Sequence, residues 1–183
     1  TFADGADIIT ASAGTSNFRV GVNAGNSIES GGNYNVVVGD EAGTAITTGD
    51  NNTAIGYAAL DANTTGSANT AVGTNALAVN TTGQHNVGLG SLALSANTTG
   101  NQNTAIGYQT MFSNTTGTRN TASGHGALYT NTTASDNSAF GYYALVYNTT
   151  GTRNTAVGTY ALDANTTTSY NTAVGYLSLS ANT

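Results

Sequence analysis

Short hydrophobic segments recur along the chain with a fixed period, separated by polar segments rich in turn-forming residues. The fullest form of the unit is N-T-A-(I/V)-G-Y-x-A-L-x-x-N-T-T-G-x-x, which residues 52–68 follow closely. A weaker copy begins at Asn17, one position out of register with the copy that begins at Asn35. A fixed period of this length, with units too short to fold alone, is typical of a solenoid that stacks its repeats.

The residues within one unit predict two strands and a turn. Gly, Asn and Thr interrupt each unit too often for a helix of about ten residues. N-T-A-I-G-Y predicts a first strand, x-A-L-x-x predicts a second, and N-T-T-G predicts a turn. Stacked coils would pair equivalent strands in parallel sheets. The expected fold is therefore an all-β solenoid, a β-roll of ten coils that is about 48 Å long at ~4.8 Å per coil.

Equivalent residues of successive units are expected to stack as structural ladders. The Asn ladder contains Asn52, Asn69, Asn86, Asn103, Asn120, Asn137, Asn154 and Asn171. The Gly ladder contains Gly56, Gly73, Gly90, Gly107, Gly124, Gly141, Gly158 and Gly175. The aliphatic ladder contains Ile55, Val72, Leu89, Ile106, Phe140, Val157 and Val174, and Ser123 interrupts it for no evident reason. A second apolar ladder contains Leu60, Leu77, Leu94, Met111, Leu128, Leu145, Leu162 and Leu179.

Alternation along the strand assigns residues to two faces. Thr53, Ile55 and Tyr57 share one face, and Ala54 and Gly56 share the other. Because the Ile55 position is apolar in nearly every copy, its face is predicted to point inward and the Ala/Gly face to be outward and flat. Two or three large side chains per coil make a thin core. We therefore expect the Ala/Gly face and the Leu ladder to be covered by other copies of the chain, most simply in a homotrimer.

The units also resemble a known family. N-T-A-I-G at 52–56 and N-T-A-V-G at 69–73, 154–158 and 171–175 resemble the S-V-A-I-G repeats of trimeric autotransporter adhesin heads. The whole unit is similar to repeats in phage tail-fibre-like proteins, closely over 35–183 and loosely over 17–34. The resemblance implies a left-handed, trimeric β-roll that serves as a fibre shaft or adhesive stalk. It implies an extracellular place on a virion or cell surface, with a host glycan or receptor as partner.

The period also predicts the domain organisation. Residues 1–16 fall outside the period and are expected to form a linker or a degenerate coil. Residues 17–183 are expected to form a ten-coil solenoid that belongs to a longer fibre.

Composition narrows the functional classes. Charged residues make up only 7% of the chain, against a usual ~25%, and the net charge is −6. The lack of Cys excludes disulfides and thiolate metal sites. The three basic residues are too few for a nucleic-acid surface or a polybasic membrane patch. No apolar run reaches the ~20 residues of a membrane span. We expect no nucleic-acid partner and no membrane insertion.

Few residues suggest chemistry. His85 and His125 occupy different repeat positions and have no fixed carboxylate partner, so we expect no catalytic site, metal or cofactor. Tyr57, Tyr108, Tyr142 and Tyr176 share one row, which would either bind sugars or pack at the sheet edge. Seven Asn-Thr-Thr sequons match glycosylation acceptors or, alternatively, turns with an Asn hydrogen-bond ladder. They begin at Asn63, Asn80, Asn97, Asn114, Asn131, Asn148 and Asn165.

Three functions compete on this evidence. The first is a non-catalytic fibre shaft or adhesive stalk assembled by self-association. The second is an ice-binding solenoid that uses the row Thr53, Thr70, Thr104, Thr121, Thr155 and Thr172. The third is a polysaccharide lyase on a β-helix, but such an enzyme needs irregular loops with clustered acids and bases. The uniform repeat favours the fibre.

Overall fold

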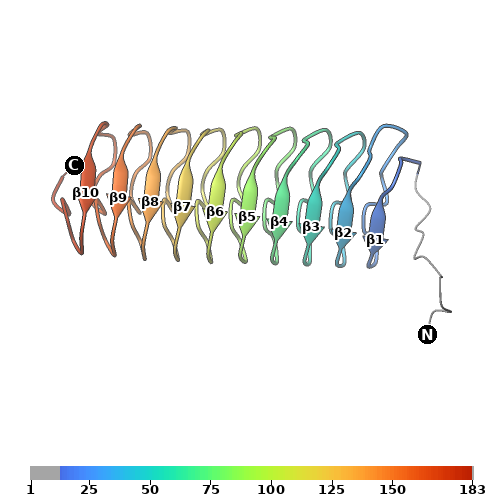
Figure 1. The fold of residues 1–183 in the computed structure, drawn as a ribbon, viewed down its shortest axis with the longest axis horizontal. Coiled ribbons are helices and arrows are strands. Elements are labelled where there is room, and N and C mark those ends of the chain that lie inside the picture. The colour runs from blue at the N-terminus through green and yellow to red at the C-terminus, as the bar shows by residue number, and fades with distance from the viewer. Residues whose placement is uncertain (1–12, 183) are drawn as a thin grey trace.

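The computed structural model describes residues 13–182 and contains ten strands of three residues each in that range. They are β1 (Phe18–Val20), β2 (Val36–Val38), β3 (Thr53–Ile55), β4 (Thr70–Val72), β5 (Val87–Leu89), β6 (Thr104–Ile106), β7 (Thr121–Ser123), β8 (Ser138–Phe140), β9 (Thr155–Val157) and β10 (Thr172–Val174). All ten form one sheet in chain order, with one strand from each coil (Figure 1).

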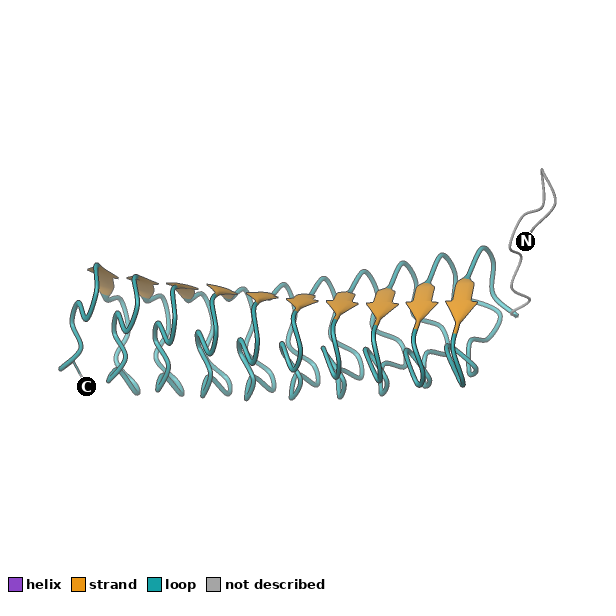
Figure 2. Cartoon of the chain, turned by 90° about the horizontal axis from the view of Figure 1, so that it is seen from below, coloured by secondary structure: helices purple, strands orange, loops and turns teal. Residues whose placement is uncertain are grey.

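Each strand pairs in parallel with the next at the interval of the repeat. Thr53, Ala54 and Ile55 of β3 lie opposite Thr70, Ala71 and Val72 of β4, as the ladders predicted. The sheet occupies one side of an elongated rod, and the turns occupy the other (Figure 2). The predicted all-β solenoid of 17-residue coils is confirmed. Its handedness and subunit number stay predictions, and most of the N-terminal segment 1–16 lies outside the described residues.

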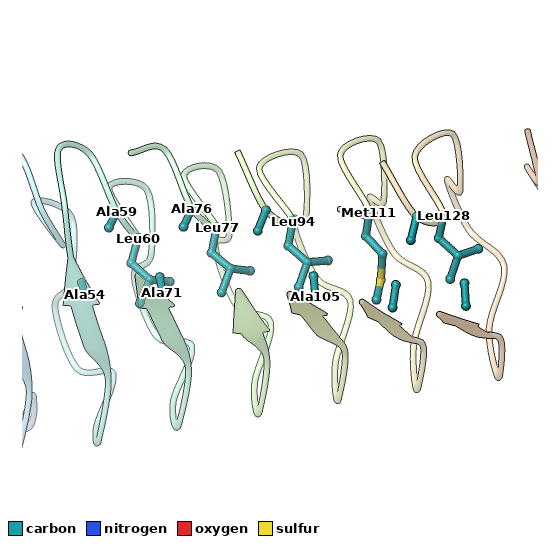
Figure 3. Close-up of a cluster of buried hydrophobic side chains, with 14 of the residues drawn as sticks. Ala54, Ala59, Leu60, Ala71, Ala76, Leu77, Leu94, Ala105, Met111 and Leu128 are labelled. Carbon is teal, nitrogen blue, oxygen red and sulfur yellow. The ribbon is translucent and has the colours of Figure 1, made fainter. Parts of the chain in front are cut away.

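The assignment of the two strand faces was wrong. Ala54 and its equivalents point into the coil and are fully buried, whereas the Ile55 side chain points outward and is 39% exposed. Figure 3 shows the Ala row facing Leu60 and Leu77 from the opposite wall. The Leu ladder is fully buried from Leu60 to Leu162. The Ala and Leu ladders therefore fill the interior of one chain and are not available to other copies.

The second predicted strand was also wrong. The A-L-x-x stretch forms turns, and the described chain holds one sheet rather than several. Leu60 has a φ of 53° and Leu77 one of 51°, in the left-handed region that Leu seldom adopts. A residue with this φ turns the backbone sharply and therefore cannot belong to an extended strand. Burial of the Leu side chain in the coil offsets the local strain.

The first two coils fill the same volume with different residues. Gly43 stands where later coils have Leu, and Ile46 stands where they have the turn Asn. A Cβ on Gly43 would lie 2.7 Å from Cδ1 of Ile46, so the Ile side chain occupies the Leu space. Gly25 and Ile28 show the same exchange in the first coil, where a Cβ on Gly25 would lie 2.8 Å from Cδ1 of Ile28. The interior volume is thus kept while the residue identities change.

Loss of a buried Leu should be costly in so narrow a core. Leu94→Ala is expected to lower the free energy of unfolding by about 3 kcal/mol, because a fully buried side chain would leave a cavity. Urea denaturation followed by circular dichroism measures the change. The control is Val79→Ala, since Val79 is 43% exposed and its row holds Ala62 and Ala96. Equal losses in the two variants would contradict the placement of the Leu ladder.

Candidate functional site

A row of buried Asn side chains precedes the strands. Each is hydrogen-bonded to the same residue of the next coil: Oδ1 of Asn52 accepts from the backbone N of Asn69 at 3.0 Å and from its Nδ2 at 3.2 Å. Nδ2 of Asn69 also donates to the turn carbonyl of Gly83 at 2.8 Å. Because both ends of the buried amide are bonded, the cost of its desolvation is offset. This strand Asn row, which contains the predicted Asn ladder, is therefore structural.

A second Asn row runs through the turns. Nδ2 of Asn80 donates to Oδ1 of Asn63 at 2.8 Å and to the carbonyl of Gly83 at 3.0 Å. The carbonyl of Gly83 thus accepts from both Asn rows, which fixes the turn between them. The Asn hydrogen-bond ladder predicted for the sequons is confirmed. All seven sequon Asn side chains are fully buried, so their Nδ2 atoms are not accessible to a glycosylating enzyme in the folded coil.

The outer face of the sheet carries two parallel rows of exposed or half-buried side chains. One row follows Thr53 and is mostly Thr with some Val, and the other is the aliphatic ladder that follows Ile55. No Asp, Glu, Lys or Arg occurs at an outward strand position in β1–β10. The outer face therefore carries an aliphatic row beside a mostly Thr row and no formal charge along the full described length of the rod.

Aromatic side chains gather beside this face, where the chain leaves the strands. Ring centroids lie 5.2 Å apart both between Tyr108 and His125 and between His125 and Tyr142. Tyr143 and Tyr160, one position further along their coils, pack against Tyr142 at 4.5 and 5.5 Å. We call these five residues the aromatic cluster. The predicted Tyr row supplied Tyr108 and Tyr142, while Tyr57 lies apart, separated by the coils that hold Thr74 and Ser91.

The sequence pattern did not point to Tyr143 and Tyr160 as members of the aromatic cluster. Tyr143 and Tyr160 share one repeat position in successive coils, and their separation by one full period was the available signal. Desolvation raises the pKa of both hydroxyls above the ordinary value, and a hydrogen bond with Tyr142 adds to the shift at Tyr160.

The two histidines are not brought together. His85 is exposed at a turn, and His125 lies in the aromatic cluster with Nε2 3.2 Å from the hydroxyl of Tyr143. Within the described residues there is no group of three His, Cys, Asp or Glu side chains that could hold a metal ion. Nor does any described helix have the length and apolarity to cross a bilayer.

The two positions before each strand Asn differ between coils, as in Thr118-Arg119 and Ser135-Asp136, and form a polar edge with few charges. Nε of Arg119 donates to Oδ1 of Asp136 at 2.6 Å, and Nη2 of Arg119 donates to Oδ2 of Asp136 at 3.0 Å. This hydrogen bonding lowers the pKa of the Asp136 carboxyl below its ordinary value. Both side chains are open to solvent, so the pair adds little stability.

These features define a β-solenoid repeat protein whose Asn, Ala and Leu ladders are structural and whose outer sheet face carries no charge. No family model, no curated protein and no solved structure matches the chain.

Proposed function

We propose that the chain is a non-catalytic, self-associating fibre shaft or adhesive stalk, extracellular on a virion or cell surface. The observation that carries the proposal is the uncharged outer sheet face, whose aliphatic row runs beside the Thr row over β1–β10 with one interruption at Ser123. A long exposed row of apolar side chains of this kind marks an interaction site. A host glycan or receptor would be the distal partner of such a stalk.

The repeat favours a second copy of the chain as the occupant of this face. The side-chain rows of this face repeat once per coil along the whole rod. A rigid partner fits them over that length only if its own side chains repeat at the same axial spacing, and a second copy of the chain meets this condition. The net charge of −6 does not oppose the contact, because the face carries none of it. The family resemblance implies a trimer, and three rods that turn their sheets to a common axis would bury these faces with closed symmetry.

The mass in solution tests this proposal. Sedimentation equilibrium should give three times the chain mass of 18.2 kDa. The double variant Ile106→Glu with Val157→Glu should be monomeric with an unchanged circular dichroism spectrum, because unpaired carboxylates would be buried at the contact. The control is Val79→Glu, at an exposed turn position outside the sheet. A monomeric wild-type chain would contradict self-association, and a dimer would contradict the threefold arrangement.

One observation favours ice binding as a second candidate. The Thr row points out from the sheet, with Thr53 and Thr70 in register on adjacent strands. A regular hydroxyl row on an uncharged face is suited to ordered water. We expect no thermal hysteresis in a freezing-point assay, since the row includes Val36 and Val87. Clear hysteresis that is lost in Thr104→Lys, but kept in the exposed turn variant Thr99→Lys, would overturn the shaft proposal.

A further inference from the structure

The aromatic cluster coincides with a break in the repeat. The coil of β7 has Ser123 where most coils have an aliphatic residue, and His125 where Tyr is the commonest residue. It also has Gly126, two residues after the Gly that follows the strand. These departures fall within four consecutive residues, and they stand directly before the coil that holds Tyr142 and Tyr143. Neighbouring changes of this kind indicate one local surface rather than unrelated drift.

Gly126 allows the cluster to form. A Cβ at this position would lie 2.3 Å from Cε1 and 2.5 Å from Cδ1 of Tyr143, so any side chain would displace that ring. With Gly126 present, the ring of Tyr143 lies against the backbone and its hydroxyl reaches Nε2 of His125 at 3.2 Å. The imidazole in turn sits between Tyr108 and Tyr142. The lack of a side chain at Gly126 thus leaves room for the ring of Tyr143 from the next coil.

The exposed part of the cluster is amphipathic and contains no Asp, Glu, Lys or Arg side chain. Tyr108 is 46% exposed and Tyr142 is 43% exposed, so each offers apolar ring surface together with a hydroxyl group. The ring contacts of the cluster join only Tyr and His side chains. A matching ligand has an apolar face, a rim of hydrogen-bonding groups and no charge, which describes the pyranose rings of a neutral saccharide.

The spacing of the rings gives the direction of such a ligand. Tyr108, His125 and Tyr142 come from three successive coils, and their centroids follow one another at 5.2 Å along the rod. That repeat is close to the length of one sugar residue, so a linear chain parallel to the rod axis would meet one ring per residue. The cluster lies after the strands, so it borders the outer sheet face without being part of it.

We propose that the aromatic cluster, centred on His125 and Tyr142, binds an uncharged oligosaccharide that lies along the rod. This deepens the adhesive role proposed above and rests on it, while self-association is a separate property with its own measurement. The contact is non-covalent: the ring faces of Tyr108 and Tyr142 pack against sugar C–H groups, and the Tyr hydroxyls bond the rim.

The test uses the wild-type chain with soluble neutral β-glucan, α-glucan, mannan and galactan, and with polygalacturonate as a charged comparison. Affinity electrophoresis and isothermal titration calorimetry measure binding. At least one neutral polymer should retard the chain, and Tyr142→Ala and Tyr108→Ala should each weaken binding at least tenfold. Tyr57→Ala is the matched control, because Tyr57 shares the row and is 52% exposed but lies outside the cluster.

Four outcomes would overturn the proposal. They are no retardation by any neutral polymer, equal loss in Tyr57→Ala, binding of polygalacturonate alone, and a drop in oligomer mass in Tyr142→Ala. The last would make the cluster a subunit contact. Sedimentation of each variant keeps a failure of the sugar site distinct from a failure of self-association, and circular dichroism confirms that each variant folds.

Discussion

Gly90→Ala, a change within the Gly ladder, is expected to disrupt the stack more than the same change at a turn glycine. Gly90 has a φ of 133°, a conformation open essentially to Gly alone. An added Cβ would also lie 2.5 Å from the carbonyl oxygen of Gly107 in the next coil. Strain and overlap together should lower the free energy of unfolding by about 3 kcal/mol or more. Urea denaturation measures the loss.

Hydrogen exchange should show where this damage falls. Each coil contacts only its neighbours, so a defect between two coils loosens the stack locally. Amides around Gly90 and Gly107 should therefore show a larger increase in exchange rate than amides in distant coils.

The matched control for Gly90→Ala is Gly83→Ala. A Cβ on Gly83 would approach the carbonyl oxygen of Gly100 equally closely, at 2.5 Å, and would also lie 2.3 Å from Oδ1 of Asn80. The turn position, however, has no left-handed φ, and the chain itself places Ala134 there. Because the overlap at Gly83 is at least as severe, a smaller loss in Gly83→Ala than in Gly90→Ala would identify the backbone conformation as the cause. If Gly83→Ala is as damaging as Gly90→Ala, backbone conformation is not the cause.

Among the variants described, Asn103→Asp should cause the second largest loss in the free energy of unfolding at neutral pH. The oxygen that remains can still accept from the backbone N of Asn120, at 3.0 Å in the native ladder. The new oxygen, however, replaces an Nδ2 that donates to Oδ1 of Asn86 at 3.2 Å and to the carbonyl of Gly117 at 2.8 Å. A buried carboxylate would then face two acceptors, at an expected cost of about 3 kcal/mol or more.

Acid should partly reverse the loss in this variant. Burial among acceptors would raise the pKa of the introduced carboxyl above its unfolded value of ~3.9. The folded state therefore gains on proton binding, and stability should recover as pH falls through the raised folded pKa. Comparing urea midpoints with those of the wild type at neutral and mildly acidic pH measures this recovery. Asn101→Asp is the control, since Asp50 already occupies that partly exposed row. An unchanged midpoint for Asn103→Asp at neutral pH would contradict the amide orientation in the ladder.

The functional surfaces were only partly visible in the sequence. The Tyr row was predictable because its members recur at multiples of the period, but the cluster also needs Tyr143 and Tyr160 from the adjacent position. Contact between the rings of these two rows depends on the stacking distance between coils and on the space left by Gly126. Neither quantity is encoded in a single repeat.

The turns show a similar division. The polar N-T-T-G segment predicted a turn and an Asn ladder, and both occur. The sequence did not reveal that the two Asn rows meet at one carbonyl, such as that of Gly83, because Asn69 and Asn80 stand at distant positions of the unit and meet only when the coil closes. Nor did it predict a left-handed conformation for Leu60, since packing overrides the local preference of that residue.

The fixed period determined by itself that the chain is a stacked solenoid, which rows align and where the polar turn falls. Alternation further determined that the strand has two different faces. Only the tertiary structure decided which face is inside. Ala54 faces the fully buried Leu60, whereas the larger Val37 is buried in the coil that has Gly43 in the Leu position, and the Ile55 side chain points outward. Side-chain volume inside the coil, rather than hydrophobicity, decided which face of the sheet is exposed on the rod.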